Sequence, residues 1–191
     1  MLSEKKMLMT NEVSREVAKI VLKAKYPNLI MVDEKNDGLV TAAKNIRAEL
    51  KAAYPGVKFT VRTERFSMGD AIRVGWTDGP NTAQVEAITN KYESGHFNGM
   101  EDIYEYNRSD WKDAFGDAKY ITTNRRYSDS LIESAIGYVA NKYGVEPISV
   151  EQYTRGGAWG WKTDSGYALD RVLNIHLSKL SRALPDKLIV H

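Results

Sequence analysis

The sequence lacks cysteine altogether, with 0 cysteines among its 191 residues. This excludes disulfide bonds, thiolate zinc sites and cysteine nucleophiles, and it suits a reducing compartment. No apolar run approaches the length of about 18 residues that a membrane-spanning helix needs. Residues Met1–Lys6 include an acid and are followed by no long apolar stretch, unlike a secretory signal. We therefore expect a cytoplasmic protein with no membrane partner.

A strong charge of one sign is also missing, since the formal net charge is +2. That balance is too small to indicate nucleic-acid binding by itself. The charge is nevertheless uneven, because residues 77–117 carry 3 Lys or Arg against 9 Asp or Glu. Such a block is typical of a solvated helix and loop. The alternative is an acidic patch that binds a basic partner or mimics nucleic acid.

The apolar periodicity predicts an α+β fold for a chain of single-domain length. Apolar residues at spacings of three and four indicate helices, whereas alternation of apolar and polar residues indicates strands. The predicted helices cover residues 11–26, 39–54, 83–92, 128–143 and 165–184. The predicted strands cover residues 57–62, 72–77 and 120–123, and residues 94–111 are predicted to be mostly loop.

The first two strands predict a hairpin, which a third strand extends into one small antiparallel sheet. Helices are expected to pack on the apolar face of this sheet, and extra N- and C-terminal helices are expected to complete the same core. We therefore divide the chain into an N-terminal helical arm (1–38), a central α+β domain (39–128) and a C-terminal helical extension (129–191).

The polar face of the hairpin is the first candidate binding surface. Alternation is expected to project Lys58, Arg62 and Arg73 together, with Arg65 in the link between the strands. Cations on a sheet face can contact phosphates. An outer sheet face must be polar in any case, however, and the sequence indicates no aromatic side chains there to stack bases. Both interpretations remain open.

A second basic and aromatic set lies toward the C-terminus. Its candidate binding residues are Arg125, Arg126, Trp159 and Trp161. Two tryptophans separated by a glycine are costly to leave in water, which favours a buried hairpin. The alternative is an anchor for a protein partner.

No catalytic or metal-binding pattern stands out. The three histidines, His96, His176 and His191, share no spacing of four, and there is no glycine-rich phosphate loop. The carboxylates Asp110, Asp113 and Asp117 could share a helix face, but exposed acids at this spacing are common. We therefore expect no catalytic residues, no metal and no cofactor, and a protein that is not an enzyme.

One stretch carries a family resemblance, over about residues 39–128. Its most specific part is Trp76-Thr77-Asp78-Gly79-Pro80, supported by residues 58–62, 69–75, 97–102 and 120–128. This stretch resembles the large polyvalent protein-associated domain, the type numbered twenty-nine. The resemblance implies a protein of phages and conjugative elements, in which such domains are thought to enter a host with the DNA and to blunt its defences. It implies no catalytic residues.

The sequence therefore leads us to expect a non-catalytic binding protein of a phage or mobile genetic element in the cytoplasm of a bacterial host. The expected activity is to counteract a host defence system, of the anti-CRISPR or anti-restriction type, by contact with a host defence protein complex. The alternative is a nucleic-acid-binding accessory protein that uses the basic face of the hairpin.

Overall fold

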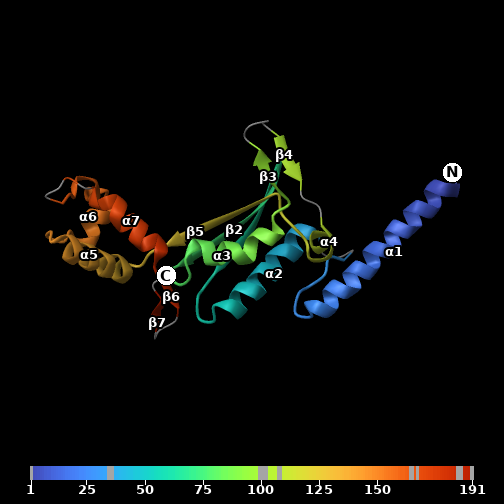
Figure 1. The fold of residues 1–191 in the computed structure, drawn as a ribbon, viewed down its shortest axis with the longest axis horizontal. Coiled ribbons are helices and arrows are strands. Elements are labelled where there is room, and N and C mark those ends of the chain that lie inside the picture. The colour runs from blue at the N-terminus through green and yellow to red at the C-terminus, as the bar shows by residue number, and fades with distance from the viewer. Residues whose placement is uncertain are drawn as a thin grey trace.

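The computed structural model of the chain describes residues 2–33, 37–98, 103–106, 109–163, 166, 168–183 and 187–189. The α-helices are α1 (Leu2–Lys25), α2 (Gly38–Ala53), α3 (Thr82–Thr89), α4 (Asp110–Phe115), α5 (Asp129–Tyr143), α6 (Val150–Thr154) and α7 (Leu169–Lys179). The strands are β1 (Thr60–Phe66), β2 (Gly69–Thr77), β3 (Gly95–Asn98), β4 (Ile103–Tyr106), β5 (Tyr120–Arg126), β6 (Ser181–Ala183) and β7 (Lys187–Ile189). Figure 1 shows the sheet of β1, β2 and β5 between α1 at one end and α5–α7 at the other.

Helix α2 forms because its ends are well capped and one face is continuously apolar. The Asp37 carboxylate accepts a hydrogen bond from the Val40 amide (2.9 Å), which satisfies a donor of the first turn. Leu39, Ile46 and Leu50 are buried on the side that packs against the sheet. The helix ends before Pro55, as the sequence predicted.

The main sheet has the strand order β1-β2-β5. Strands β1 and β2 form the predicted antiparallel hairpin, in which Arg62 lies opposite Arg73. The predicted fold class is confirmed as a hairpin plus a third strand packed by helices. The sheet is mixed rather than wholly antiparallel, because β5 pairs with β2 in parallel. The reason is the connection: the chain crosses over through α3 and returns to the end of the sheet where β2 begins.

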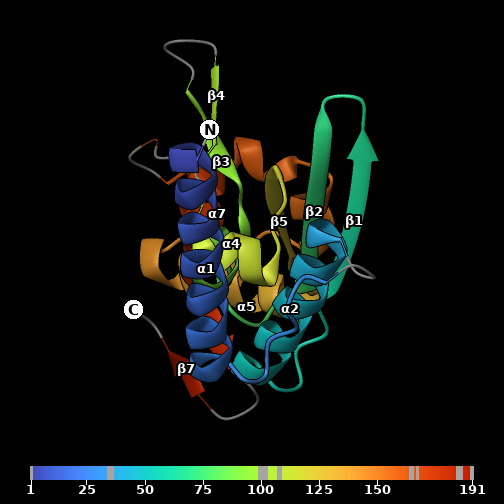
Figure 2. The ribbon, with the colours of Figure 1, turned by 90° about the vertical axis from the view of Figure 1, so that its right-hand side faces the viewer.

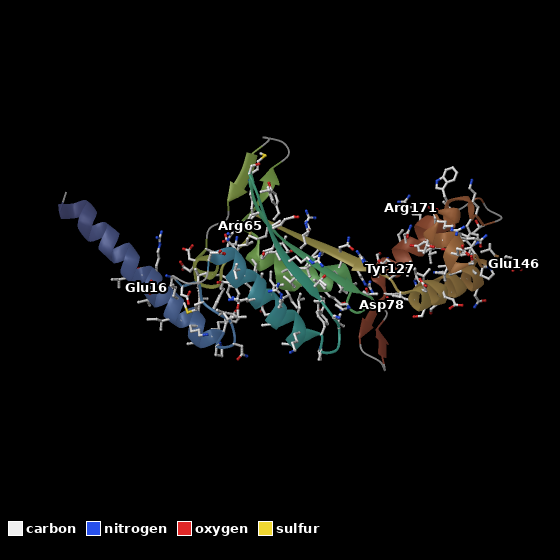
Figure 3. All side chains as sticks on the ribbon, turned by 180° about the vertical axis from the view of Figure 1, so that it is seen from behind. Glu16, Arg65, Asp78, Tyr127, Glu146 and Arg171 are labelled. Atoms are coloured by element: carbon white, nitrogen blue, oxygen red, sulfur yellow. The ribbon has the colours of Figure 1, made fainter. Side chains whose placement is uncertain are left out.

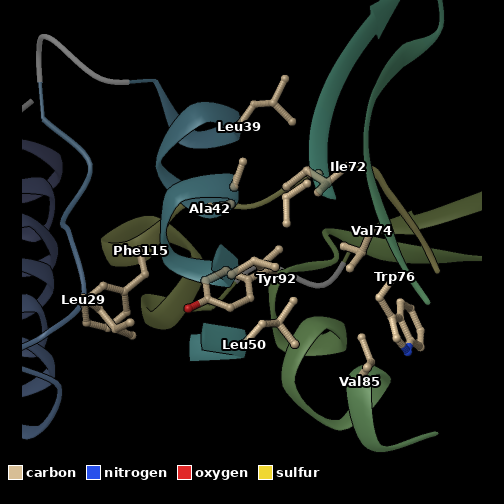
Figure 4. Packing of buried hydrophobic residues seen from close by; sticks show 14 of the residues in the cluster. Leu29, Leu39, Ala42, Leu50, Ile72, Val74, Trp76, Val85, Tyr92 and Phe115 are labelled. Atoms are coloured by element: carbon tan, nitrogen blue, oxygen red, sulfur yellow. The ribbon is translucent and has the colours of Figure 1, made fainter. Parts of the chain in front are cut away.

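One face of this sheet is covered by helices. Helix α2 packs against β1 and β2, and α3 packs against β5. The inward-facing residues Val61, Ile72, Val74 and Trp76 join the helices in one apolar cluster (Figure 4). Neither helix packs on the opposite face, where the exposed residues of the sheet lie.

The segment 94–111 is not mostly loop, and that prediction is wrong. It contains β3 and β4, which pair antiparallel with Gly95 opposite Tyr106, and the start of α4. The Gly, Asn and acidic residues of the segment suggested a loop, yet the β-prone residues Ile103 and Tyr106 bound β4. Helix α4 begins after Ser109, whose hydroxyl accepts from the Lys112 amide (3.4 Å).

A buried amide ties three segments of the core together. The side chain of Asn45 is on α2 and the residue is 0% exposed. Its Oδ1 accepts from the Ile30 amide (2.7 Å), while its Nδ2 donates to the carbonyl oxygens of Ile30 (2.8 Å) and Phe115 (3.0 Å). The 29–32 segment and the end of α4 are therefore held against α2 by one side chain.

The C-terminal helices pack around an apolar cluster of their own. Leu131, Val139, Leu173 and Leu177 belong to this second cluster, which shares no residue with that of the sheet domain. The expectation of one shared core thus does not describe residues 129–180. Helix α7 is shorter than the predicted 165–184 helix, because Leu180 leaves the helical conformation and β6 follows.

Helix α1 projects away from the sheet domain (Figures 1 and 2). Its last part is anchored, because Leu22 and the following Tyr26 pack on the core, with the Tyr26 ring edge-on to Trp111 (centroids 4.6 Å apart). The N-terminal helix was expected to complete the core, but its apolar residues Val13, Val17 and Ile20 are each more than half exposed. Among the residues that the structure describes, no helix combines the length and the apolar character needed to cross a membrane.

Candidate functional site

The uncovered face of the sheet gathers cationic side chains from all three strands. Strand alternation puts Arg62 and Arg73 on this face, since their neighbours Val61, Ile72 and Val74 are buried on the other. The structure also brings Arg126 of β5 and Lys58, just before β1, to the same surface. We call Lys58, Arg62, Arg73 and Arg126 the basic face.

The basic face surrounds a shallow groove of about 710 Å³. Between the cations the groove is lined mainly by small residues, namely Thr60, Gly75, Thr77, Thr122, Thr123 and Asn124. The Thr60 hydroxyl donates to the Gly75 carbonyl oxygen (3.0 Å), which keeps that side chain flat against the sheet. Gly75 has no side chain to fill the groove. The position has no room for one, because a Cβ there would lie 2.8 Å from the Thr60 hydroxyl oxygen.

Little negative charge offsets these cations. Glu64 of β1 forms an ion pair with Arg73 (Nε to Oε2, 2.7 Å), with side chains that are 50% and 63% exposed. Such an exposed pair is weak, because water and salt screen it. Lys58, Arg62 and Arg126 form no ion pair with any residue in the described part of the chain.

Two aromatic rings lie on the same side of the sheet, at the end away from Lys58 and Arg126. The rings of Phe66 and Tyr120 are nearly parallel, with an interplanar angle of 20° and centroids 6.2 Å apart. We call this pair the aromatic platform. The sequence predicted no aromatic side chains on this face, and that prediction is wrong. Phe66 falls outside the predicted strand 57–62, whereas in the structure it ends β1 on the outward side.

Arg65, labelled in Figure 3, follows Arg62 by three residues on β1, so its side chain lies on the opposite side of the sheet from the basic face. It forms an ion pair with Asp37, the residue that caps α2. The Val40 amide and the Arg65 guanidinium both lower the pKa of the Asp37 carboxyl group. The structure thus gives Arg65 a contact at the start of α2, away from the other predicted binding residues.

Arg125 also faces away from the basic face. Its guanidinium donates to the carbonyl oxygens of Asp78 (3.0 Å), Gly79 (3.2 Å) and Leu177 (3.2 Å), and burial lowers its pKa. The Asp78 carboxylate also links the two parts: it accepts hydrogen bonds from the Ser128 amide (2.8 Å) and hydroxyl (2.7 Å) at the start of α5. Arg125 therefore connects the sheet to the C-terminal helices.

The two predicted tryptophans have different environments. Trp161 is 8% exposed and donates its indole N–H to the Glu146 carbonyl oxygen (2.9 Å), so it is part of the second apolar cluster. Trp159 is 81% exposed, in the 3-10 turn Gly157–Gly160. The structure does not bring either of them to the basic face.

The other candidate groups form no site among the described residues. No cluster of three or more His, Asp or Glu residues suited to a metal ion occurs in the described part of the chain. Asp117 instead accepts a hydrogen bond from the Ser94 hydroxyl (2.6 Å). His176 stacks on Tyr138 (centroids 4.3 Å apart), and burial followed by the Lys142 charge lowers its pKa. The side chains of His96 and His191 lie outside the part of the chain that the structure describes.

The fold and this surface define an α+β sheet domain with one helix-covered face and one open cationic face. Residues 39–128 match the family model described as large polyvalent protein associated domain 29. This confirms the resemblance drawn from the sequence, and it supports the association with phages and other mobile elements that the resemblance implies. No curated protein and no solved structure matches the chain.

Proposed function

We propose that the chain is a non-catalytic binding protein of a phage or mobile element, and that the basic face binds the phosphate backbone of nucleic acid. The observation that carries this proposal is the pairing of Arg62 with Arg73 across β1 and β2. Like charges placed directly opposite each other destabilise a sheet. The exposed Glu64–Arg73 ion pair offsets part of that repulsion, and a bound polyanion would relieve the rest, so the arrangement favours an anionic ligand.

The spacing of the cations also suits an extended polyanion. Strand β5 runs from Tyr120 to Arg126 and is roughly 20 Å long, at about 3.3 Å per residue. The cations lie at two levels about 13 Å apart, since Arg62 and Arg73 are level with Thr122 and Arg126 ends the strand four residues later. A backbone that follows the groove can thus meet several positive charges in succession.

Salt dependence provides the first test of this function. If all four side chains of the basic face contact phosphates, the slope of log affinity against log salt is about −2.8 for a single strand. Affinity measured by fluorescence anisotropy then falls about 50-fold between about 50 and 200 mM salt. The variant Arg62→Ala/Arg126→Ala is expected to halve the slope to about −1.4.

The matched control is Lys51→Ala/Arg171→Ala, which removes the same charge from exposed positions on α2 and α7. It is expected to keep the slope of the unmodified protein. The proposal is wrong if neither single-stranded nor duplex nucleic acid binds at about 50 mM salt. Equal weakening by the two double variants would also overturn it, because general charge rather than the basic face would then explain binding.

The second candidate function is contact with a host defence protein. It rests on Trp159. Gly157 holds the turn that carries Trp159 against α6, where a Cβ would lie 2.8 Å from the Gln152 carbonyl oxygen. An exposed tryptophan on an ordered turn is the type of residue that anchors protein interfaces. The excess of acidic residues over 77–117 in the sequence is a further reason to expect a basic protein partner.

A pull-down from nuclease-treated host lysate tests this candidate. The expected result is that the unmodified protein and Arg62→Ala/Arg126→Ala retain a defence protein in stoichiometric amount, whereas Trp159→Ala loses it. Truncating such an anchor typically weakens binding by about 2 kcal/mol or more. Retention of the same proteins by all three forms would exclude Trp159 as the anchor.

A further inference from the structure

Strand β1 is an edge strand of the main sheet, since its only strand neighbour is β2 (Figure 2). All of its residues except Val61 are exposed. A strand edge carries a row of backbone N–H and C=O groups that can pair with another strand. The residues of β1 that direct these groups outward therefore decide what can pair there.

Backbone hydrogen bonds fix which residues of β1 point outward, because the N–H and C=O groups of successive residues alternate between the two sides of a strand. The amide of Asp78, directly after β2, donates to the Arg126 carbonyl oxygen (2.8 Å), so even-numbered residues of β2 face β5. Arg73 therefore faces β1, where its partner is Arg62. The residues of β1 that direct their backbone groups outward are Val61, Thr63 and Arg65.

This edge is open to a further strand. In the segments that the structure describes, no residue forms a hydrogen bond with the outward backbone groups of Thr63. The Arg47 guanidinium donates to the Val61 carbonyl oxygen, which agrees with the outward orientation of that group. A carbonyl oxygen has two lone pairs, so this contact leaves room for a second hydrogen bond.

We infer that the partner of this edge is β1 of a second copy of the chain, in antiparallel orientation with the two Thr63 residues opposite each other. This register pairs all 7 residues of the strand, and outward backbone groups meet outward backbone groups throughout. Arg62 then lies opposite Glu64 of the second copy, and Phe66 lies opposite Thr60. Pairs of opposite charge, of two threonines, and of an aromatic with a β-branched residue all stabilise antiparallel strands.

The charges of β1 also select this register. The nearest alternatives that keep the hydrogen-bonding pattern place either the two Arg62 residues or the two Glu64 residues opposite each other. Like charges in that position destabilise a sheet. Complementary charge therefore specifies a second copy of this strand as the occupant, with Thr63 at the centre.

The inferred dimer has a consequence for the basic face. The two-fold axis between antiparallel strands is perpendicular to the sheet, so both copies present the same side of their sheets. Two three-stranded sheets thus become one, with the basic faces of both copies on a common surface. The inference goes beyond the proposed function and does not depend on it.

Sedimentation velocity of the full chain, without nucleic acid, tests the dimer. An edge contact is small, so the unmodified protein is expected to change from monomer to dimer between about 1 and 100 μM. Arg62→Glu and Glu64→Arg are each expected to raise the dimer Kd at least about tenfold, because each places like charges opposite each other twice. An equimolar mixture of the two variants is expected to dimerise about as well as the unmodified protein, because each introduced charge then meets its opposite.

The control is Val17→Ser/Ile20→Ser, which removes exposed apolar side chains from α1 and is expected to leave the dimer unchanged. A unmodified chain that stays monomeric at about 100 μM would overturn the inference. So would a mixture that dimerises no better than its components. Loss of the dimer in the control variant alone would place the interface on α1 instead.

Hydrogen exchange of the unmodified protein covers the case in which a charge variant does not fold. The amides of Val61, Thr63 and Arg65 are expected to exchange more slowly at about 100 μM than at about 1 μM, because each gains an acceptor in the dimer. Exchange of these amides at the same rate at both concentrations would show that β1 does not pair. None of these measurements involves nucleic acid, so their failure leaves the proposed function standing.

Discussion

Replacing Gly116 with alanine is expected to lower the free energy of unfolding by about 4 kcal/mol, or to prevent folding. Gly116 ends α4 with φ of 83°, a conformation that costs an L-residue free energy. A Cβ there would lie 2.1 Å from the Gly38 carbonyl oxygen and 2.9 Å from the Ala42 amide nitrogen. Both are backbone atoms at the start of α2, so the contact is relieved only if the two helices separate.

Urea unfolding of Gly116→Ala measures this effect, and Gly137→Ala is its matched control. Gly137 lies inside α5, and a Cβ there would meet nothing within 4 Å. Because alanine favours helix over glycine, the control is expected to raise stability by up to about 1 kcal/mol. If Gly116→Ala unfolds at the urea concentration of the unmodified protein, α4 does not approach α2 as closely as described.

Replacing Asn45 with alanine is expected to lower the free energy of unfolding by about 4 kcal/mol. The substitution removes the partner of the Ile30 amide and of the carbonyl oxygens of Ile30 and Phe115. A buried polar group left without a partner costs about 1–3 kcal/mol, and the lost side-chain volume adds to that cost.

Asn141→Ala is the comparison for this substitution, because Asn141 is exposed on α5. Its effect is expected to stay within about 0.5 kcal/mol of zero. Hydrogen exchange gives a second readout, since the Ile30 amide is expected to exchange rapidly in Asn45→Ala. Slow exchange of that amide in the variant would show that another acceptor protects it.

The elements that the sequence predicted well are those with local signals. Helix α2 combines an apolar stripe with a proline-glycine stop, and the β1-β2 hairpin combines alternation with turn residues. The direction of β5 depends on how the chain returns to the sheet after α3, which no local pattern records. The same holds for Asn45, whose partners Ile30 and Phe115 lie 15 and 70 positions away.

The candidate site was predictable in part. Alternation along each strand correctly placed Arg62 and Arg73 together on the exposed face. The same rule separates Arg65 from Arg62 and Arg125 from Arg126, because an odd spacing along a strand puts side chains on opposite faces. The pairing of Phe66 with Tyr120 could not be read from the sequence, since it requires the register of three strands.

Because β5 joins the sheet through a long crossover, the sheet can be completed only late in the synthesis of the chain. The middle strand, β2, receives its second neighbour only when residues 120–126 have left the ribosome. Until then the nascent chain presents an open hydrogen-bonding edge, which can pair with strands of other chains. Fragments that end before residue 120 keep that edge permanently, so they are poor substitutes for the intact chain in binding studies.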